Sequence, residues 1–204
     1  LVVYNFPLNF ITEISNFRDA KNNILNKIWY FGIIDEKRIP VDIFKKLSLS
    51  YAEKIDIFGY VSPASNFKVE NFDFLSYKGE FSPNNMNFLN HYNILLFATD
   101  KELNLNYKYC MPNKIFQAVA FNLDIYVSDF YEEINSTFDE CRVDDDIALK
   151  NNLIRLSSYK MKNRLDQLYL TSKENFLKVV GWNMNSFVSI IMPAYKAETM
   201  ISDS

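Results

Sequence analysis

Two continuous apolar runs constrain the fold of this chain more than any other feature. Residues 27–34 read KIWYFGII and residues 93–99 read NILLFAT, and polar or charged residues flank both. A strand that is apolar at successive positions is buried on both faces, as in a parallel sheet covered by helices. Further strands are predicted at residues 54–60 (KIDIFGY), within residues 72–81, and at residues 124–129 (DIYVSD).

Helical patterns separate the predicted strands. Helices are expected to open at Pro40, Pro83 and Pro112, and residues 151–180 read as helical with many charges. This alternation predicts an α/β fold, a Rossmann-like parallel sheet with helices on both faces. Ligands bind such sheets beyond the carboxyl ends of the strands, where the strand order reverses. The glycines that follow three of the strands, Gly32, Gly59 and Gly79, should meet at that edge.

Composition narrows the classes of function. The 204 residues, 49% of them hydrophobic, suffice for one sizeable domain, or for one domain and a fragment of another. A net charge of −3 gives no general attraction to nucleic acid. His91 is the only histidine, which excludes a histidine triad and a multi-histidine metal site within the chain. We expect no metal and no cofactor in this domain.

The two cysteines and the hydropathy pattern indicate a cytoplasmic protein. Cys110 and Cys141 lack the spacing of metal ligands and are expected to be reduced thiols. No apolar run approaches the roughly 20 residues of a membrane-spanning helix. Because the chain begins at Leu1, we expect it to be a fragment of a longer protein or an engineered chain.

The segment at residues 111–129, MPNKIFQAVAFNLDIYVSD, carries the strongest functional signal. Pro112 suits the first position of a helix, where its missing N–H would be unpaired anyway. Lys114 in the first turn opposes the helix dipole, so its placement favours a nearby anion. Gln117 lies three residues on and shares that face. The face could hold a phosphate-bearing ligand, although an ordinary surface lysine would explain the same pattern.

This segment resembles the nucleotide-binding signature of retaining GT-B glycosyltransferases of bacterial polysaccharide synthesis, approximately PNKIFEYMAAGLPVIASD. The chain departs from it at three positions: Gln117 replaces an acidic residue, Asn122 a glycine and Asp124 a proline. Asn122 can still end the helix, because asparagine tolerates a left-handed conformation. Gln117 can still hydrogen-bond a hydroxyl, without charge. The matching positions are Pro112, Asn113, Lys114, Ile115, Phe116, Ala120, Leu123, Ser128 and Asp129.

The resemblance implies a domain organisation and a set of site residues. Residues 28–183 would be the carboxyl-terminal, donor-binding half of such a transferase, preceded by a lead-in or linker segment at residues 1–27. Lys114 and Arg38, with Lys37 as the alternative to Arg38, would act in catalysis by stabilising the leaving diphosphate. The nucleotide-binding residues would be Gly32, Gly79, Glu80, Phe81, Pro112, Asn113, Lys114 and Gln117.

The tail resembles a second transferase. FVSIIMPAYKAETMIS, residues 187–202, is similar to the opening strand and turn of GT-A glycosyltransferases. Residues 184–204 would then begin a truncated second domain of a parent protein that fuses two transferases. The acceptor site would lie in an amino-terminal domain outside this chain, so the fragment alone is expected to be inactive.

The expected partners are a UDP- or GDP-sugar and a glycan acceptor of capsule or lipopolysaccharide synthesis. A cytoplasmic location at the inner face of the membrane would allow peripheral association of the parent protein. The substitutions at Gln117 and Asn122 support an alternative, a non-catalytic scaffold with a transferase-like fold. A nucleotide-sugar epimerase or reductase is disfavoured because no GxGxxG fingerprint occurs. The last helices could cross toward the partner domain or cap the sheet.

Overall fold

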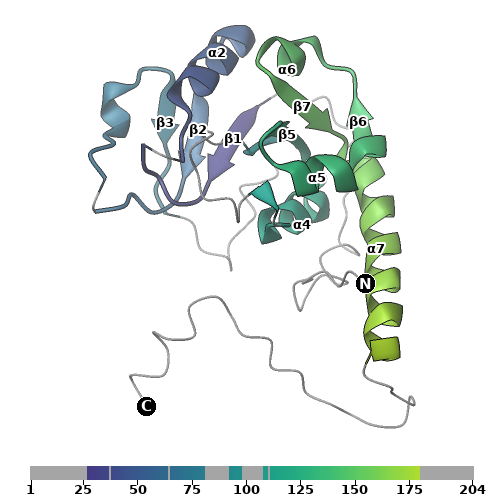
Figure 1. Ribbon diagram of the computed structural model, residues 1–204. Coiled ribbons are helices and arrows are strands. Elements are labelled where there is room, and N and C mark those ends of the chain that lie inside the picture. The colour runs from purple at the N-terminus through teal and green to yellow at the C-terminus, as the bar shows by residue number, and fades with distance from the viewer. Residues whose placement is uncertain are drawn as a thin grey trace, which may run out of the picture.

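A computed structural model describes residues 27–36, 38–63, 65–80, 92–97, 108–109 and 111–179 (Figure 1). The strands are β1 (Ile28–Phe31), β2 (Ile55–Phe58), β3 (Leu75–Tyr77), β4 (Ile94–Phe97), β5 (Asp124–Ser128), β6 (Arg142–Val143) and β7 (Leu153–Leu156). The α-helices are α2 (Val41–Tyr51), α4 (Asn113–Ala120), α5 (Glu132–Thr137), α6 (Asp146–Lys150) and α7 (Ser158–Val179). Two short 3₁₀ helices are η1 (Val69–Asn71) and η3 (Asp139–Cys141).

The described strands form one sheet in the order β3-β2-β1-β4-β5-β7-β6. All pairings from β3 to β5 are parallel. The chain moves outward from β1 to β3 and then returns to the other side of β1 with β4, so the strand order reverses between β1 and β4. This arrangement is compatible with a Rossmann-like fold, in which the point of reversal opens a ligand crevice at the carboxyl edge.

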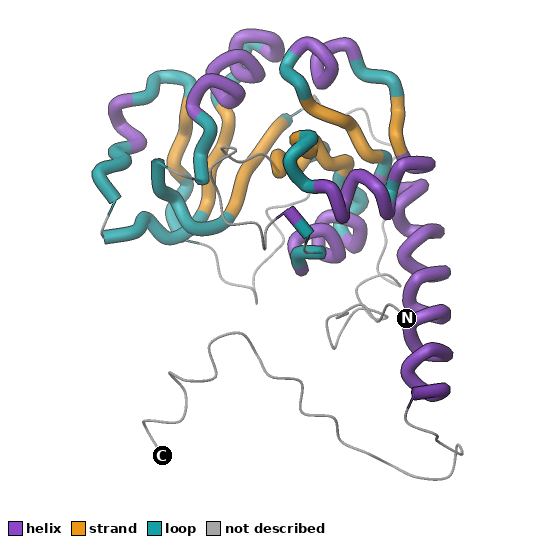
Figure 2. Tube along the Cα trace, viewed as in Figure 1, coloured by secondary structure: helices purple, strands orange, loops and turns teal. Residues whose placement is uncertain are grey.

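Helices cover both faces of the sheet, as the sequence predicts. Every residue of β1, β2 and β4 is buried. On one face Phe44 and Leu47 of α2 pack with residues of the central strands. On the other face Phe116 of α4 packs with Trp29 of β1, and Met161 of α7 joins the same core. Figure 2 shows the strands enclosed between these helices.

The prediction of a wholly parallel sheet is wrong at one end. β7 pairs antiparallel with β5, and β6 pairs antiparallel with β7. The pairing of β6 with β7 follows from the short connection between them, because only residues 144–152 separate these strands and a parallel return needs a crossover of a dozen or more residues. Here the chain turns back through α6, which has five residues, and through Asn152 in a left-handed conformation (φ 55°). The helix predicted at residues 151–180 is a strand at first, and α7 begins only at Ser158.

Helix α4 starts one residue later than predicted and ends as predicted. Pro112 is the extended N-cap residue (φ −71°, ψ 146°), and not the first helical one. Asn122 adopts the left-handed conformation with φ 54°. Its N–H donates to the Val119 carbonyl (3.0 Å), and the Leu123 N–H donates to the Ala118 carbonyl (2.9 Å). These two bonds are a Schellman motif, which satisfies the last carbonyls of the helix.

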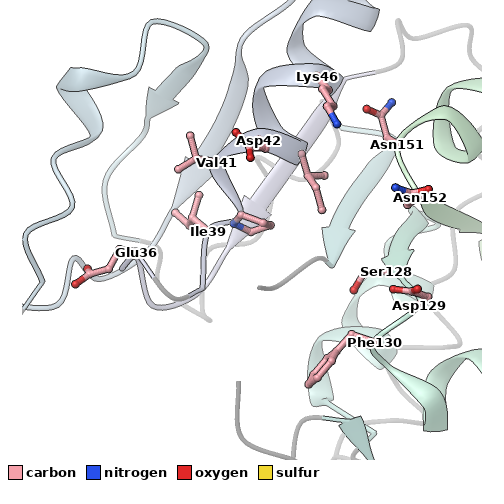
Figure 3. A pocket seen from close by; sticks show the side chains of 12 residues that line it. Glu36, Ile39, Val41, Asp42, Lys46, Ser128, Asp129, Phe130, Asn151 and Asn152 are labelled. Carbon is pink, nitrogen blue, oxygen red and sulfur yellow. The ribbon is translucent and has the colours of Figure 1, made fainter. Parts of the chain in front are cut away.

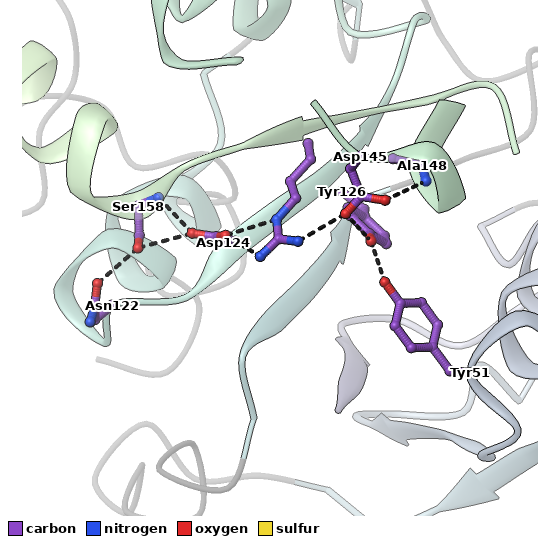
Figure 4. A network of polar contacts seen from close by, with 8 residues as sticks. Tyr51, Asn122, Asp124, Tyr126, Asp145, Ala148 and Ser158 are labelled. Carbon is purple, nitrogen blue, oxygen red and sulfur yellow. Dashed lines mark hydrogen bonds and ion pairs between the residues drawn. The ribbon is translucent and has the colours of Figure 1, made fainter. Parts of the chain in front are cut away.

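Two of the departures from the resembled signature belong to one polar network at the start of β5 (Figure 4). Asp124 pairs with Arg155 of β7 (2.7 Å) and accepts a bond from the Ser158 backbone N–H (2.9 Å). The Ser158 hydroxyl donates to Asn122 Oδ1 (2.8 Å), and Arg155 also pairs with Asp145 (2.8 Å). The network ties β7 and the start of α7 to β5, which gives residues 122 and 124 a structural role in this chain.

Candidate functional site

Three glycines lie side by side at the carboxyl edge of the sheet. Gly32, Gly59 and Gly79 follow β1, β2 and β3, each with positive φ (146°, 135° and 92°). The Gly59 N–H donates to the Gly79 carbonyl (2.9 Å), and the Gly32 N–H donates to the Phe58 carbonyl (3.0 Å). A Cβ atom on Gly59 would overlap the Gly32 carbonyl oxygen. The loops that follow these strands therefore meet at one edge, as the sequence predicts.

Lys114 reaches from α4 to the point where the strand order reverses. Its Nζ donates to the carbonyl of Phe31, the last residue of β1, at 2.5 Å. The same Nζ lies 5.9 Å from the ring centre of Phe97, the last residue of β4. β1 and β4 are the neighbours between which the order reverses. The ammonium group of Lys114 thus stands at the position where open α/β sheets bind their ligands.

The surroundings of Lys114 disfavour a solitary cation. The side chain is partly buried, and its Nζ lies 5.3 Å from the ring centre of Tyr30 and 4.7 Å from that of Phe31. Burial, and secondarily the positive charge of Arg38, lowers the pKa of Lys114 to about 8. None of the ion pairs within the described residues supplies it with a carboxylate. A desolvated ammonium in this position would gain from a bound anion.

The other predicted residues of α4 and the β1 loop lie around Lys114. Gln117 is one turn further along α4 and partly buried, while Pro112 and Asn113 form the start of that helix. Arg38 lies in the loop after β1, where its Nε is 3.2 Å from Asp35 Oδ2. Arg38 therefore contributes positive charge near Lys114 while its guanidinium is held by a carboxylate.

The remaining predicted residues are further from Lys114 or outside the described part of the chain. Gly79 and the exposed Glu80 follow β3, which β2 separates from β1. Predictions that concern Lys37, Phe81, His91, Cys110 and residues 184–204 fall outside the described residues.

Asp56 is a buried acidic residue that none of the sequence motifs includes. It lies on β2 with 3% of its surface exposed. It accepts a hydrogen bond from the Tyr92 hydroxyl (2.7 Å) and pairs with Lys27 (3.2 Å) and Lys78 (3.4 Å). The signal was available, since Asp56 is the only acidic residue in the run KIDIFGY. Three partners within the chain explain its burial structurally.

Comparison of the chain with protein-family models, with curated proteins and with solved structures finds no match. The described residues contain no cluster of three or more histidine, cysteine, aspartate or glutamate side chains that could hold a metal ion. None of the helices in the described ranges combines the length and the apolar character needed to cross a membrane.

Proposed function

We propose that this chain is the donor-binding half of a retaining GT-B glycosyltransferase that uses a UDP- or GDP-sugar in capsule or lipopolysaccharide synthesis. The observation that carries the proposal is the ammonium group of Lys114, partly desolvated and without a carboxylate among the described residues, at the reversal of the strand order. The resemblance of residues 111–129 to the transferase signature supplies the reason for choosing a nucleotide diphosphate as the anion.

The proposed chemistry follows from where charge develops. Cleavage of the bond between a sugar and a diphosphate leaves negative charge on the departing nucleoside diphosphate. Positive groups that are already in place stabilise this charge without reorganisation. Lys114 would contact the diphosphate, the amides at the start of α4 would face it, and Arg38 would add to the positive potential. Gln117, on the same face of α4, would hydrogen-bond a ribose hydroxyl.

A non-catalytic scaffold is the second candidate, and two contacts favour it. Lys114 already donates to the Phe31 carbonyl, and Arg38 is already paired with Asp35. A chain that has lost its ligand could keep both contacts for stability alone. Gln117 is uncharged at the position where the family has an acidic residue, which also favours the scaffold.

Restoring the acidic residue distinguishes the two candidates. We expect the chain to bind UDP or GDP. The Gln117→Glu variant should bind the same nucleotides roughly fivefold more tightly, because a charged acceptor strengthens a hydrogen bond by about 1 kcal/mol. Isothermal titration calorimetry with UDP, GDP, UDP-glucose and GDP-mannose measures this. Gln167→Glu adds the same charge at an exposed position of α7 and should change nothing. Absence of binding to all four ligands by the folded chain would favour the scaffold.

A further inference from the structure

A cavity of about 650 Å³ lies beside α2, and Lys114 is not among the residues that line it (Figure 3). One wall is the loop after β1 together with the first turn of α2. The opposite wall is the end of β5 and the turn between α6 and β7. The cavity therefore opens at the carboxyl edge of the sheet on the side of α2, whereas Lys114 belongs to α4, which packs on the other face.

Ser128 is the feature of this cavity that points to a ligand. It is the last residue of β5, it is 5% exposed, and its hydroxyl has no hydrogen-bond partner within the described part of the chain. Figure 3 shows this hydroxyl on the cavity side of the strand. Buried hydroxyl groups in proteins are nearly always hydrogen-bonded, because burying one without a partner is unfavourable. The oxygen has almost no accessible surface, so a ligand in the cavity would supply the missing partner once a rotation of the Ser128 side chain turns the hydroxyl toward it.

The lining of the cavity indicates the chemistry of that ligand. No side chain caps the start of α2, which leaves the backbone amides of Val41 and Asp42 as donors, whereas those of Ile43 and Phe44 already donate to the Pro40 carbonyl. Carboxylates outnumber ammonium groups in the lining, which disfavours a phosphate. Donors and acceptors of several kinds beside an aromatic ring suit a neutral compound with many hydroxyl groups. The polar and aromatic side chains are Glu36, Asp42, Lys46, Ser128, Asp129, Phe130, Asn151 and Asn152.

We propose that this cavity binds a sugar ring, with Ser128, Asp129 and Asn152 as the groups that hydrogen-bond its hydroxyls. Ser128 ends β5 and Phe31, the partner of Lys114, ends β1, with only β4 between these strands. Two interstrand spacings therefore place Ser128 roughly 10 Å from Phe31. A nucleotide sugar with its diphosphate at Lys114 could place its sugar here, and in that form the inference rests on the proposed function. A sugar unit of a glycan would offer the same chemistry.

Two conservative substitutions test the cavity. Ser128→Ala removes a hydroxyl that has no described partner, so the variant should be at least as stable as the parent chain. Asn152→Gly removes an amide, and glycine accepts the left-handed conformation of this residue (φ 55°). We expect each variant to bind UDP-glucose or GDP-mannose roughly fivefold more weakly, while its affinity for UDP and GDP is unchanged. Ser50→Ala, at an exposed position of α2 outside the cavity lining, is the matched control.

The ligands used in the titration separate the two sources of the sugar. If the two variants bind only the nucleotide sugars more weakly, the cavity holds the sugar of the donor. If they bind methyl glucoside or methyl mannoside more weakly, the cavity holds a sugar unit of a glycan. If the chain binds no nucleotide at all, the proposed function fails, and the methyl glycosides still test the cavity. The inference is overturned if no sugar-containing ligand distinguishes the two variants from the parent chain.

Discussion

Replacing Lys114 with methionine should weaken the binding of UDP or GDP by about 100-fold, which corresponds to about 3 kcal/mol. The methionine stem can keep the packing against Tyr30 and Phe31, whose rings surround the lysine. What is lost is the ammonium group, which would be paired with the diphosphate in a partly desolvated position. Removal of one partner from such a pair costs far more than removal of an exposed charge.

The same substitution should leave the unfolding temperature nearly unchanged. Lys114 gains no ion pair from the described residues, and its pKa near 8 shows that its surroundings disfavour the charge. The substitution removes a desolvated cation, which stabilises the fold, and also removes the hydrogen bond from Nζ to the Phe31 carbonyl (2.5 Å), which destabilises it, and we expect the two effects to be of similar size. Calorimetric titration and thermal unfolding of Lys114→Met check both points. Lys45→Met, at an exposed position of α2, is the control and should bind like the parent chain. If Lys114→Met and Lys45→Met bind UDP or GDP equally tightly, Lys114 does not hold the diphosphate.

Gly59→Ala should destabilise the fold by about 3 kcal/mol or more. Two costs combine at this residue. Its φ of 135° is unfavourable for any residue with a Cβ atom, and the added methyl group would overlap the backbone carbonyl of Gly32. Relief would require β1 and β2 to separate at the edge of the sheet where Lys114 lies. For a domain of this size, we expect the unfolding temperature to fall by roughly 10 °C.

Gly79→Ala is the matched control for that experiment. Gly79 also has a positive φ (92°), but a Cβ atom there would meet no other atom within 4 Å. Only the backbone strain remains, so the loss should be about 1–2 kcal/mol. Thermal and urea unfolding of both variants measure the difference. If the two substitutions destabilise the chain equally, the close approach of the Gly59 and Gly32 backbones does not limit the structure.

The sequence predicted the parallel part of the sheet well, for a physical reason. Strands such as β1 and β4 are buried on both faces and therefore appear as unbroken apolar runs. β7 gives no such signal, since it has four residues and Arg155 stands inside it. The charge of Arg155 is acceptable there only because Asp124 and Asp145 approach it from other elements. Such pairing depends on tertiary contacts, which the pattern of a single segment does not contain.

The candidate site was predictable to a similar degree. The position of Lys114 in the first turn of a helix follows from the sequence, as does the left-handed end of that helix at Asn122. The contact between Lys114 and the end of β1 does not follow, because it requires the order of the strands. Ser128 matched the resembled signature, but its unpartnered hydroxyl became visible only with the cavity beside α2.

The pKa of Lys114 with and without UDP or GDP shows whether this lysine holds the diphosphate. In the free chain burial lowers this pKa to about 8. A bound diphosphate favours the charged form and must raise the pKa, by one unit for each tenfold difference in affinity between the charged and neutral forms. The affinity of the chain for UDP or GDP should therefore be highest below pH 8, where Lys114 is charged, and should fall as the pH rises above 8.

Nuclear magnetic resonance of isotope-labelled lysine can follow this group, with the Lys114 signal assigned by its absence in Lys114→Met. We expect a pKa near 8 in the free chain and a value at least one unit higher with the nucleotide bound. A pKa that is the same with and without saturating nucleotide would contradict the claim that Lys114 holds the diphosphate.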